Sequence, residues 1–155
     1  MSSFRRRSAR YVSRPKRNAE RVVRAGVSTV APDTQQTAYT YTASEACVAR
    51  SIKLDIGCTF VGAENAYMPY ALVVVREGYN ANGLNYPALS DDLYNPTMDV
   101  LISGILTDNG VEDHKWNSIG RKLKKGDRLC LIVRNVSPAG AGTIVAFEMN
   151  FSVLT

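Results

Sequence analysis

Hydrophobic and polar residues alternate along most of the chain after residue 36. The alternation is clearest in residues 47–60 and 143–154, where nearly every second side chain is apolar. A period of two is the pattern of a β-strand that buries one face and exposes the other. This region contains no convincing capped stretch with the 3.6-residue spacing of an amphipathic helix. The pattern therefore predicts an all-β domain.

Seven runs with strand character are separated by turn sequences rich in Gly, Asn, Asp and Pro. Residues 71–75, Ala-Leu-Val-Val-Val, form a continuous apolar run, which is typical of a strand covered on both faces. Residues 27–30 offer an eighth, short edge strand. Successive strands without intervening helices predict an antiparallel sandwich or barrel. The seven runs are residues 37–42, 47–60, 70–76, 98–106, 116–123, 128–136 and 143–154.

Charge is distributed very unevenly along the chain. The first 24 residues carry nine cations and one anion, whereas the other 131 carry ten cations and thirteen anions. A basic segment with few apolar residues cannot offset the entropy lost on ordering its backbone. We therefore expect residues 1–24 to form a disordered arm, residues 25–36 a connector and residues 37–155 the folded domain. The arm cations are Arg5, Arg6, Arg7, Arg10, Arg14, Lys16, Arg17, Arg21 and Arg24.

An arginine-rich arm of this kind is predicted to bind nucleic acid. Guanidinium groups contact phosphate in a bidentate manner, and such contacts carry little sequence information. Phe4 and Tyr11 are available to stack on bases. The clusters at residues 5–7 and 14–17 also match nuclear-import signals. A solubilising tail and a mitochondrial presequence are the alternatives, and Pro15 argues against the helix that a presequence needs.

A second basic cluster lies just before a Lys-Gly-Asp turn. It is either a solvated hairpin or a further surface that faces a polyanion. The cluster consists of Arg121, Lys122, Lys124 and Lys125.

The sequence is poor in catalytic groups. Its single histidine, His114, lies among charged residues and is expected on a solvated loop, so neither a nucleophile triad nor a clustered metal site is available. No phosphate-binding loop, dinucleotide fingerprint or zinc spacing occurs. We expect no enzyme activity, cofactor or metal. Calcium at a subunit boundary remains open for the paired acidic residues Asp91, Asp92, Glu112 and Asp113, although solvated loops are the simpler interpretation.

The cysteines and the hydropathy of the chain bear on whether the protein has buried thiols or a membrane partner. Cys47, Cys58 and Cys130 lie within strand-like runs, where a reduced cysteine behaves as a small buried hydrophobe. No apolar run has the length that a membrane-spanning helix needs, and no apolar segment follows the N-terminal charges as in a secretory signal. We therefore expect no membrane partner.

Several stretches resemble one family across nearly the whole chain. They are residues 39–46 (YTYTASEA), 73–78 (VVVREG), 93–94 (LY), 102–104 (ISG) and 123–129 (LKKGDRL). Together with the basic arm and the single β domain, they resemble the capsid proteins of small circular single-stranded DNA viruses, in the circovirus-like group that encodes a replication initiator.

The resemblance implies a specific fold and assembly. The fold would be an antiparallel eight-stranded jelly-roll sandwich with a disordered basic N-terminal arm. About sixty copies would close a small icosahedral (T=1) shell around single-stranded viral DNA, with the arms pointing inward. Host nuclear import machinery would be a partner, and the protein would occupy the virion and, during assembly, the host nucleus.

Other classes fit the sequence to different degrees. Coat proteins of satellite RNA viruses share the jelly-roll architecture, so the arm alone does not distinguish DNA from RNA. A cellular single-strand-binding barrel would require cations and aromatic side chains spread over one sheet face. A cupin enzyme would need clustered histidines, which this chain lacks.

Overall fold

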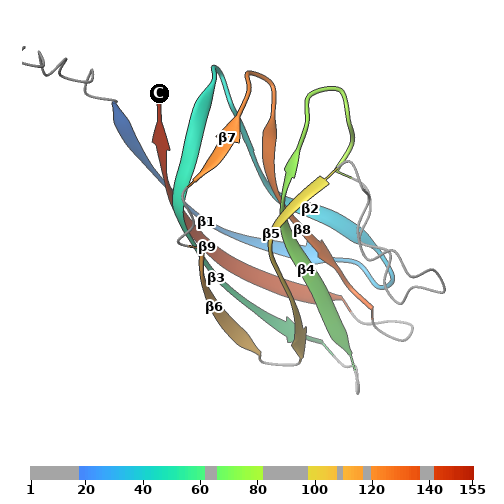
Figure 1. Cartoon of the computed structure of the whole chain (residues 1–155). Helices are drawn as coiled ribbons and strands as arrows, with labels where there is room; N and C mark the ends of the chain where they lie inside the picture. The colour runs from blue at the N-terminus through green and yellow to red at the C-terminus, as the bar shows by residue number, and fades with distance from the viewer. Residues whose placement is uncertain (1–17, 62–65, 82–97, 108–109, 117–119, 137–141) are drawn as a thin grey trace, which may run out of the picture.

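The computed structural model describes residues 18–61, 66–81, 98–107, 110–116, 120–136 and 142–155. These residues form nine β-strands (Figure 1), and none of them forms a helix long and apolar enough to cross a membrane. The strands are β1 (Ala19–Val30), β2 (Gln35–Thr42), β3 (Cys47–Phe60), β4 (Tyr67–Val75), β5 (Met98–Thr107), β6 (Val111–Trp116), β7 (Arg121–Leu123), β8 (Arg128–Arg134) and β9 (Thr143–Leu154).

The strands form two antiparallel sheets. Sheet A has the order β1-β9-β3-β6, and β7 also pairs with β3; sheet B has the order β2-β8-β4-β5. Apolar side chains from both sheets form one buried cluster, to which the inward rows of β3, β4, β8 and β9 all contribute. The prediction of an all-β, antiparallel two-sheet fold is therefore confirmed.

Strand β9 shows the predicted alternation without a break. Its inward residues Val145, Phe147, Met149, Phe151 and Val153 are buried, and the residues between them are partly or fully exposed. It pairs with β1 along all twelve residues and with β3 over most of its length. Because it lies between these two strands, β9 is the interior strand that holds sheet A together.

Strand β4 is buried on both faces, as its continuous apolar run predicts. Tyr70, Leu72 and Val74 face the main core. Ala71 and Val73 face the other way, into a second buried cluster with Val75 of β4 and Cys130 and Ile132 of β8. Cys47 and Cys58 are also buried, and neither forms a disulfide, so the expectation that the cysteines behave as buried core residues is confirmed.

The boundary of the folded body differs from the sequence prediction. Strand β1 starts at Ala19, inside the segment 1–24 that was expected to be disordered, and it runs on through the first half of the connector to Val30. Val22 and Val30 are buried. The pairing with β9 provides the hydrogen bonds and the apolar contacts that offset the entropy of ordering this segment. That partner lies more than a hundred residues away in sequence, so local charge gave the wrong boundary.

The region around His114 also differs from the prediction. Residues 116–123 were expected to form one strand, with His114 on the loop before it. Instead, residues 111–116 form β6 and residues 121–123 form β7, and both pair with β3. The charged sequence of β6 has low intrinsic strand propensity, which cross-strand pairing overrides. The described residues therefore form nine strands, where eight were expected.

Asp127 ties three chain segments together at one end of the sandwich. The residue is 2% exposed, and its carboxylate accepts hydrogen bonds from the Lys124 amide (2.9 Å), the Glu77 amide (3.2 Å) and Arg76 Nη1 (2.6 Å). The Asp127 carbonyl also accepts from the amide of Ala43, next to the end of β2. Burial alone raises the pKa of the Asp127 carboxyl, but these donors outweigh it and hold that pKa below its usual value.

Replacing Asp127 with Asn should destabilise the fold by about 1–3 kcal/mol at pH 7, because a charged acceptor with three donors is lost. A lowered folded-state pKa contributes stability above the unfolded value of about 3.9 and loses it as pH falls through the folded value. The difference between wild type and variant should therefore shrink below about pH 4. Urea unfolding of both proteins at pH 7 and below about pH 4 measures this difference in the free energy of unfolding.

Asp113→Asn is the matched control, because Asp113 is exposed on β6, and it should change the free energy of unfolding by less than about 0.5 kcal/mol. An equal loss in the two variants would contradict the role given to Asp127.

Candidate nucleic-acid interface

The outward face of sheet A carries a basic band where the chain enters the fold. Strand register places Lys122 of β7, Val48 of β3, Leu154 of β9 and Ala19 of β1 in one cross-strand row. The next row on this face joins Arg50, Ser152 and Arg21. A third row adds Lys53 and Lys115. The basic band is Arg21, Arg50, Lys53, Lys115 and Lys122.

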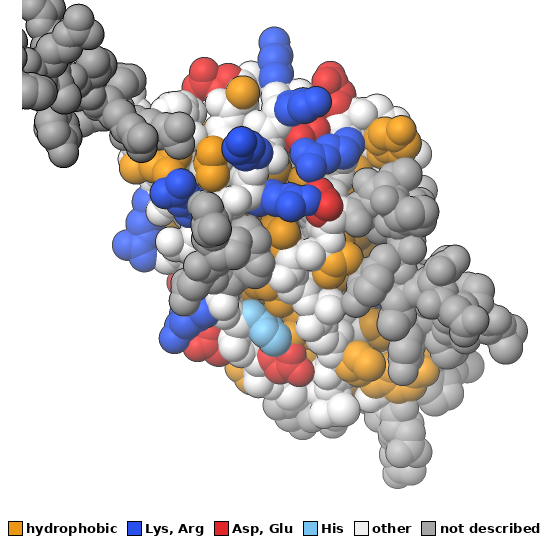
Figure 2. Space-filling view, in the orientation of Figure 1, with side chains coloured by type: hydrophobic (Ala, Val, Ile, Leu, Met, Phe, Trp, Pro, Cys, Tyr) orange, Lys and Arg blue, Asp and Glu red, His pale blue; other side chains and the backbone are white. Residues whose placement is uncertain are grey.

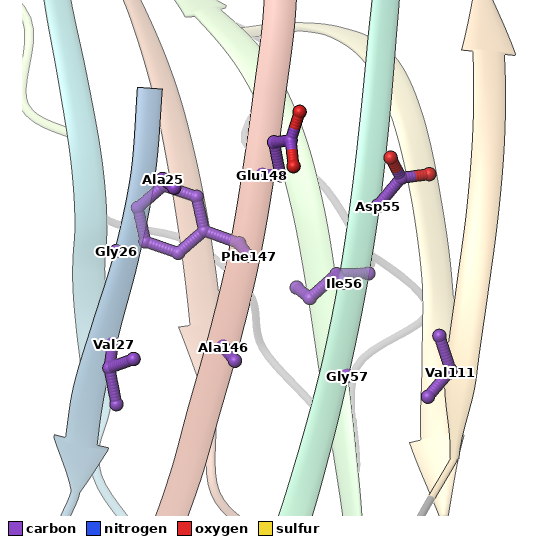
Figure 3. Close-up of a pocket in the computed structure, with 10 residues that line it drawn as sticks. All are labelled: Ala25, Gly26, Val27, Asp55, Ile56, Gly57, Val111, Ala146, Phe147 and Glu148. Atoms are coloured by element: carbon purple, nitrogen blue, oxygen red, sulfur yellow. The ribbon is translucent and has the colours of Figure 1, made fainter. Parts of the chain in front are cut away.

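Further along the same face the charge changes sign and then disappears. Asp55 lies opposite both Glu148 and Asp113, which makes an acidic row. Beyond it, small and apolar residues line a shallow hollow that runs from Val27 to Val111 (Figure 3). The acidic row would repel a polyanion, so we expect nucleic acid to contact only the basic band.

The N-terminal arm leaves the body beside the basic band. The carbonyl of Asn18 accepts a hydrogen bond from the amide of Thr155 (3.2 Å), and Ala19 pairs with Leu154. A groove lined by Lys122, Lys124, Leu154 and Thr155 lies at the same end. Figure 2 shows Lys and Arg side chains gathered over this end of the molecule, with acidic side chains between some of them. Residues 1–17 are thus attached next to a basic groove.

The cations expected in the arm fall into three groups. Arg5, Arg6, Arg7, Arg10, Arg14, Lys16 and Arg17 lie outside the described residues. Arg21 belongs to β1, where its Nε donates to Asn150 Oδ1 (3.0 Å) on the outward face of sheet A. Arg24 lies on the opposite face of β1, toward Tyr39 of sheet B. Arg21 and Arg24 are thus strand residues, and only Arg21 joins the basic band.

The second basic cluster is also divided by the fold. Arg121 points inward and forms an ion pair with Asp99 of β5, which also pairs with Arg76 (2.9 Å). Lys122 and Lys124 line the groove, and Lys125 is exposed in the turn. Among the described residues these three lysines form no ion pair. Three of the four predicted cations therefore remain available to a polyanion.

Sequence reasoning missed the contribution of Arg50, Lys53 and Lys115. Each occupies an outward strand position. Alternation alone could have placed Arg50 and Lys53, but not Lys115, because the charged sequence of β6 does not predict a strand. Their alignment with Arg21 depends on strand register and on a bulge between Arg50 and Lys53. Lys53 and Lys115 are partly neutralised by Asp55 (2.7 Å) and Asp113 (3.8 Å), so Arg50 is the strongest of the added cations.

His114 lies in a polar cluster that connects the two sheets, and the prediction of a solvated loop residue was wrong. From β6 of sheet A, His114 Nε2 and Glu112 Oε2 approach each other at 2.8 Å. Both contact the hydroxyl of Tyr70, which reaches them from β4 of sheet B. Burial and the Glu112 carboxylate raise the pKa of Tyr70, so its hydroxyl stays protonated and donates.

The same strand decides one of the open calcium sites. Glu112 points inward to Tyr70, whereas Asp113 points outward to Lys115. Neighbouring residues of a strand lie on opposite faces, so this acidic pair does not converge on one ion. Asp91 and Asp92 lie outside the described residues. Within the described parts of the chain, no three His, Cys, Asp or Glu side chains form a metal-binding group.

Gly104 of β5 makes room for this polar cluster. A Cβ at this position would lie 2.6 Å from Glu112 Oε2 and 2.7 Å from Tyr70 Cζ. Gly104→Ala should therefore push Tyr70 away from Glu112 and destabilise the fold by about 1–3 kcal/mol. Chemical denaturation measures the change.

Gly142→Ala is the matched control for this prediction. The nearest atom to its added Cβ is 3.8 Å away, an ordinary van der Waals contact, and its backbone is free of positive-φ strain. We expect stability within about 0.5 kcal/mol of wild type. A Gly104→Ala variant as stable as Gly142→Ala would show that the Tyr70 contacts are not constrained.

Comparison with known proteins does not assign a family. No family model and no curated protein matches the chain. A solved structure of the Gt strain of infectious bursal disease virus is similar over 90% of this chain, with a TM-score of 0.43 and 8% sequence identity. The match covers 33% of that viral chain, so this chain spans about a third of its length. A likeness this low supports no argument about function, and the resemblance to circovirus-like capsid proteins stays a prediction.

Proposed function

We propose that this protein is a viral capsid protein whose basic arm binds single-stranded nucleic acid while its β-sandwich builds the shell. The observation that carries the proposal is the point at which the arm joins the folded body. Residues 1–17, with seven cations, are attached at Asn18 beside the groove of Lys122 and Lys124. The arm and this end of sheet A can therefore contact one phosphate backbone.

Strand order supports a jelly roll within this proposal. Strands β6 and β7 pair with successive parts of the same side of β3, so they occupy one strand position. Counted this way, sheets A and B have four positions each, which agrees with the eight strands of a double Greek key. The chain crosses between the sheets at every connection except β4–β5 and β6–β7.

The dimensions of the arm fit an inward-facing role. Seventeen extended residues reach at most about 60 Å, several times the radius of gyration of about 14 Å expected for the body. In a shell of about sixty copies, arms with seven cations each would bring about 420 positive charges to the interior, to be neutralised by a single-stranded genome. We propose DNA as that genome on the strength of the family resemblance.

The basic band bears on the alternative of a cellular single-strand-binding module. Such modules stack bases on aromatic side chains within their cationic surface. In the three cross-strand rows that form the basic band, the residues between the cations are Val48, Leu154, Ser152 and Asn150. Among the residues whose side chains the structure describes, these rows contain no aromatic side chain. The band therefore offers phosphate contacts without stacking, which favours the shell protein.

Deleting residues 2–17 should remove most of the salt dependence of binding. Each phosphate contact on a single strand contributes about −0.7 to the slope of log K against log salt. Losing seven cations should therefore make this slope less steep by about 5. Fluorescence anisotropy with DNA and RNA oligonucleotides measures this slope. The deletion should also abolish nuclear accumulation in transfected cells if the arm carries the import signal.

Two further variants locate the rest of the interface. The double variant Lys122→Gln with Lys124→Gln should make the salt slope less steep by about 1.4. The control, Arg128→Gln with Arg134→Gln, makes the same charge change on sheet B and should leave the slope unchanged. A deletion of residues 2–17 that binds as tightly as the full chain, with the same slope, would move the binding site to the sheet and favour the single-strand-binding module.

Electron microscopy of the purified full-length protein tests the proposed assembly. The expected result is closed shells of one diameter that contain nucleic acid. The 2–17 deletion keeps all of β1 and should form empty or irregular shells, whereas a deletion through residue 24 removes Val22 and half of the β1–β9 pairing and should unfold sheet A. Protein that stays monomeric with nucleic acid bound would refute the capsid proposal.

A further inference from the structure

Three of the four sheet edges among the described strands are protected against pairing with another chain. Edge strand β2 carries a bulge at Ala38, where its register with β8 shifts. Edge strand β5 carries a bulge at Leu101 in its register with β4. Strand β6 is short and has four ionisable residues among six. Bulges, short length and charge are the usual means of preventing edge-to-edge association.

Strand β1 lacks these protections along most of its length. It is twelve residues long, contains no proline, and keeps one unbroken register with β9 from Ala19 to Val30. No described strand pairs with its other edge. Its outward row is apolar in the centre: Val23 is 45% exposed, Val27 is 74% exposed, and Ala25 between them is exposed. Figure 3 shows Ala25 and Val27 at this margin of sheet A.

The sequence of β1 is self-complementary about Ala25. A twofold axis normal to the sheet pairs outward residues with outward residues, so Ala25 would lie opposite Ala25 of the second copy. In that register Val23 lies opposite Val27 of the second copy, which makes one apolar row across the joint. The two cations meet neutral residues, because Arg21 lies opposite Thr29 and Arg24 opposite Gly26.

Neighbouring registers are less favourable. Moving the axis to Arg24 would place two arginines directly opposite each other, and like charges in that position destabilise a strand pair. Moving it to Gly26 would pair Val23 with Thr29 and break the apolar row. The register centred on Ala25 keeps residues 20–30 of both copies paired.

We propose that β1 is a docking edge for β1 of a second copy of this chain, joined antiparallel about Ala25 into one continuous sheet. This contact rests on the proposed self-assembly, which identifies the partner as a second copy of the chain. The β1 edge would form the contact between the two copies at a twofold axis. The apolar hollow between Val27 and Val111 then continues across the joint.

Disulfide capture tests the register directly. Directly opposite residues of an antiparallel pair have Cα atoms about 4.5–5.5 Å apart, within the range that a disulfide spans. In full-length Ala25→Cys, mild oxidation should form a covalent dimer at least about tenfold faster than in Val111→Cys, a control at another exposed position, on β6. The native cysteines are buried. Nuclease treatment and about 1 M salt, where the Debye length is roughly 3 Å, exclude bridging by nucleic acid.

A charge exchange tests the Val23–Val27 pairing in solution. Val23→Lys with Val27→Lys should raise the dimer dissociation constant at least about tenfold, because lysines would then face lysines across the joint. Val23→Glu with Val27→Lys should restore association. Analytical ultracentrifugation measures the dimer dissociation constants of both variants, and circular dichroism confirms that each variant folds.

The outcomes separate this inference from the proposed function. Shells that persist in the double-lysine variant, or Val111→Cys cross-linking as fast as Ala25→Cys, would overturn the β1 contact and leave the shell proposal standing. Dimers that form through Ala25 but never build shells would support the β1 contact and overturn the shell proposal.

Discussion

The structure depends on one arrangement, in which the last strand of the chain pairs between the first strand and the third. Strand β9 supplies hydrogen-bonded partners to β1 and β3, and its inward row fills the core against sheet B. Gly26 of β1 has no side chain to obstruct Phe147, whose ring would lie 2.7 Å from a Cβ at that position. Because these contacts join opposite ends of the chain, sheet A cannot be completed until the C-terminal segment is present, and we expect the slow folding typical of non-local β topologies.

The same pairing organises the charges on the outer surface. Charged and apolar residues are mixed along each strand, yet the register of β1, β9, β3 and β6 sorts them into separate rows. A slip of one residue in β9 would turn its entire alternating pattern over and destroy both the core and the rows. The register that the core requires therefore also fixes where a polyanion can bind, which links fold stability to the proposed function.

Among the described residues, polar contacts outside the apolar core also hold the sandwich together. At one end, the Asp127 carboxylate gathers donors from the β7–β8 turn and from the segment after β4. At the open β5/β6 side, the Tyr70 hydroxyl crosses from sheet B to Glu112 and His114. Buried polar groups with satisfied partners specify one arrangement of the sheets, because any other leaves them unpaired. The basic band, by contrast, lies on the outward face of sheet A and takes no part in these contacts between the sheets.

The sequence alone determined the features that depend on local pattern. Alternation in β9, the double-sided burial of β4, the buried cysteines and the turn at residues 125–127 could all be predicted, because each depends on neighbouring residues and on their period. The uneven distribution of charge likewise identified a candidate nucleic-acid interface before any fold was known.

Only the tertiary structure decided the features that depend on distant partners. Residues 19–24 form a strand because β9 pairs with them, and Arg21 lies in the same row as Arg50 because both flank Ser152. Arg121 forms an ion pair with Asp99 and so does not belong to the predicted basic surface. His114, which was expected on a loop, lies in β6 and contacts the Tyr70 hydroxyl. Backbone pairing and inter-sheet contacts join residues that are far apart in the chain, and no local pattern of charge or hydropathy encodes which of them will meet.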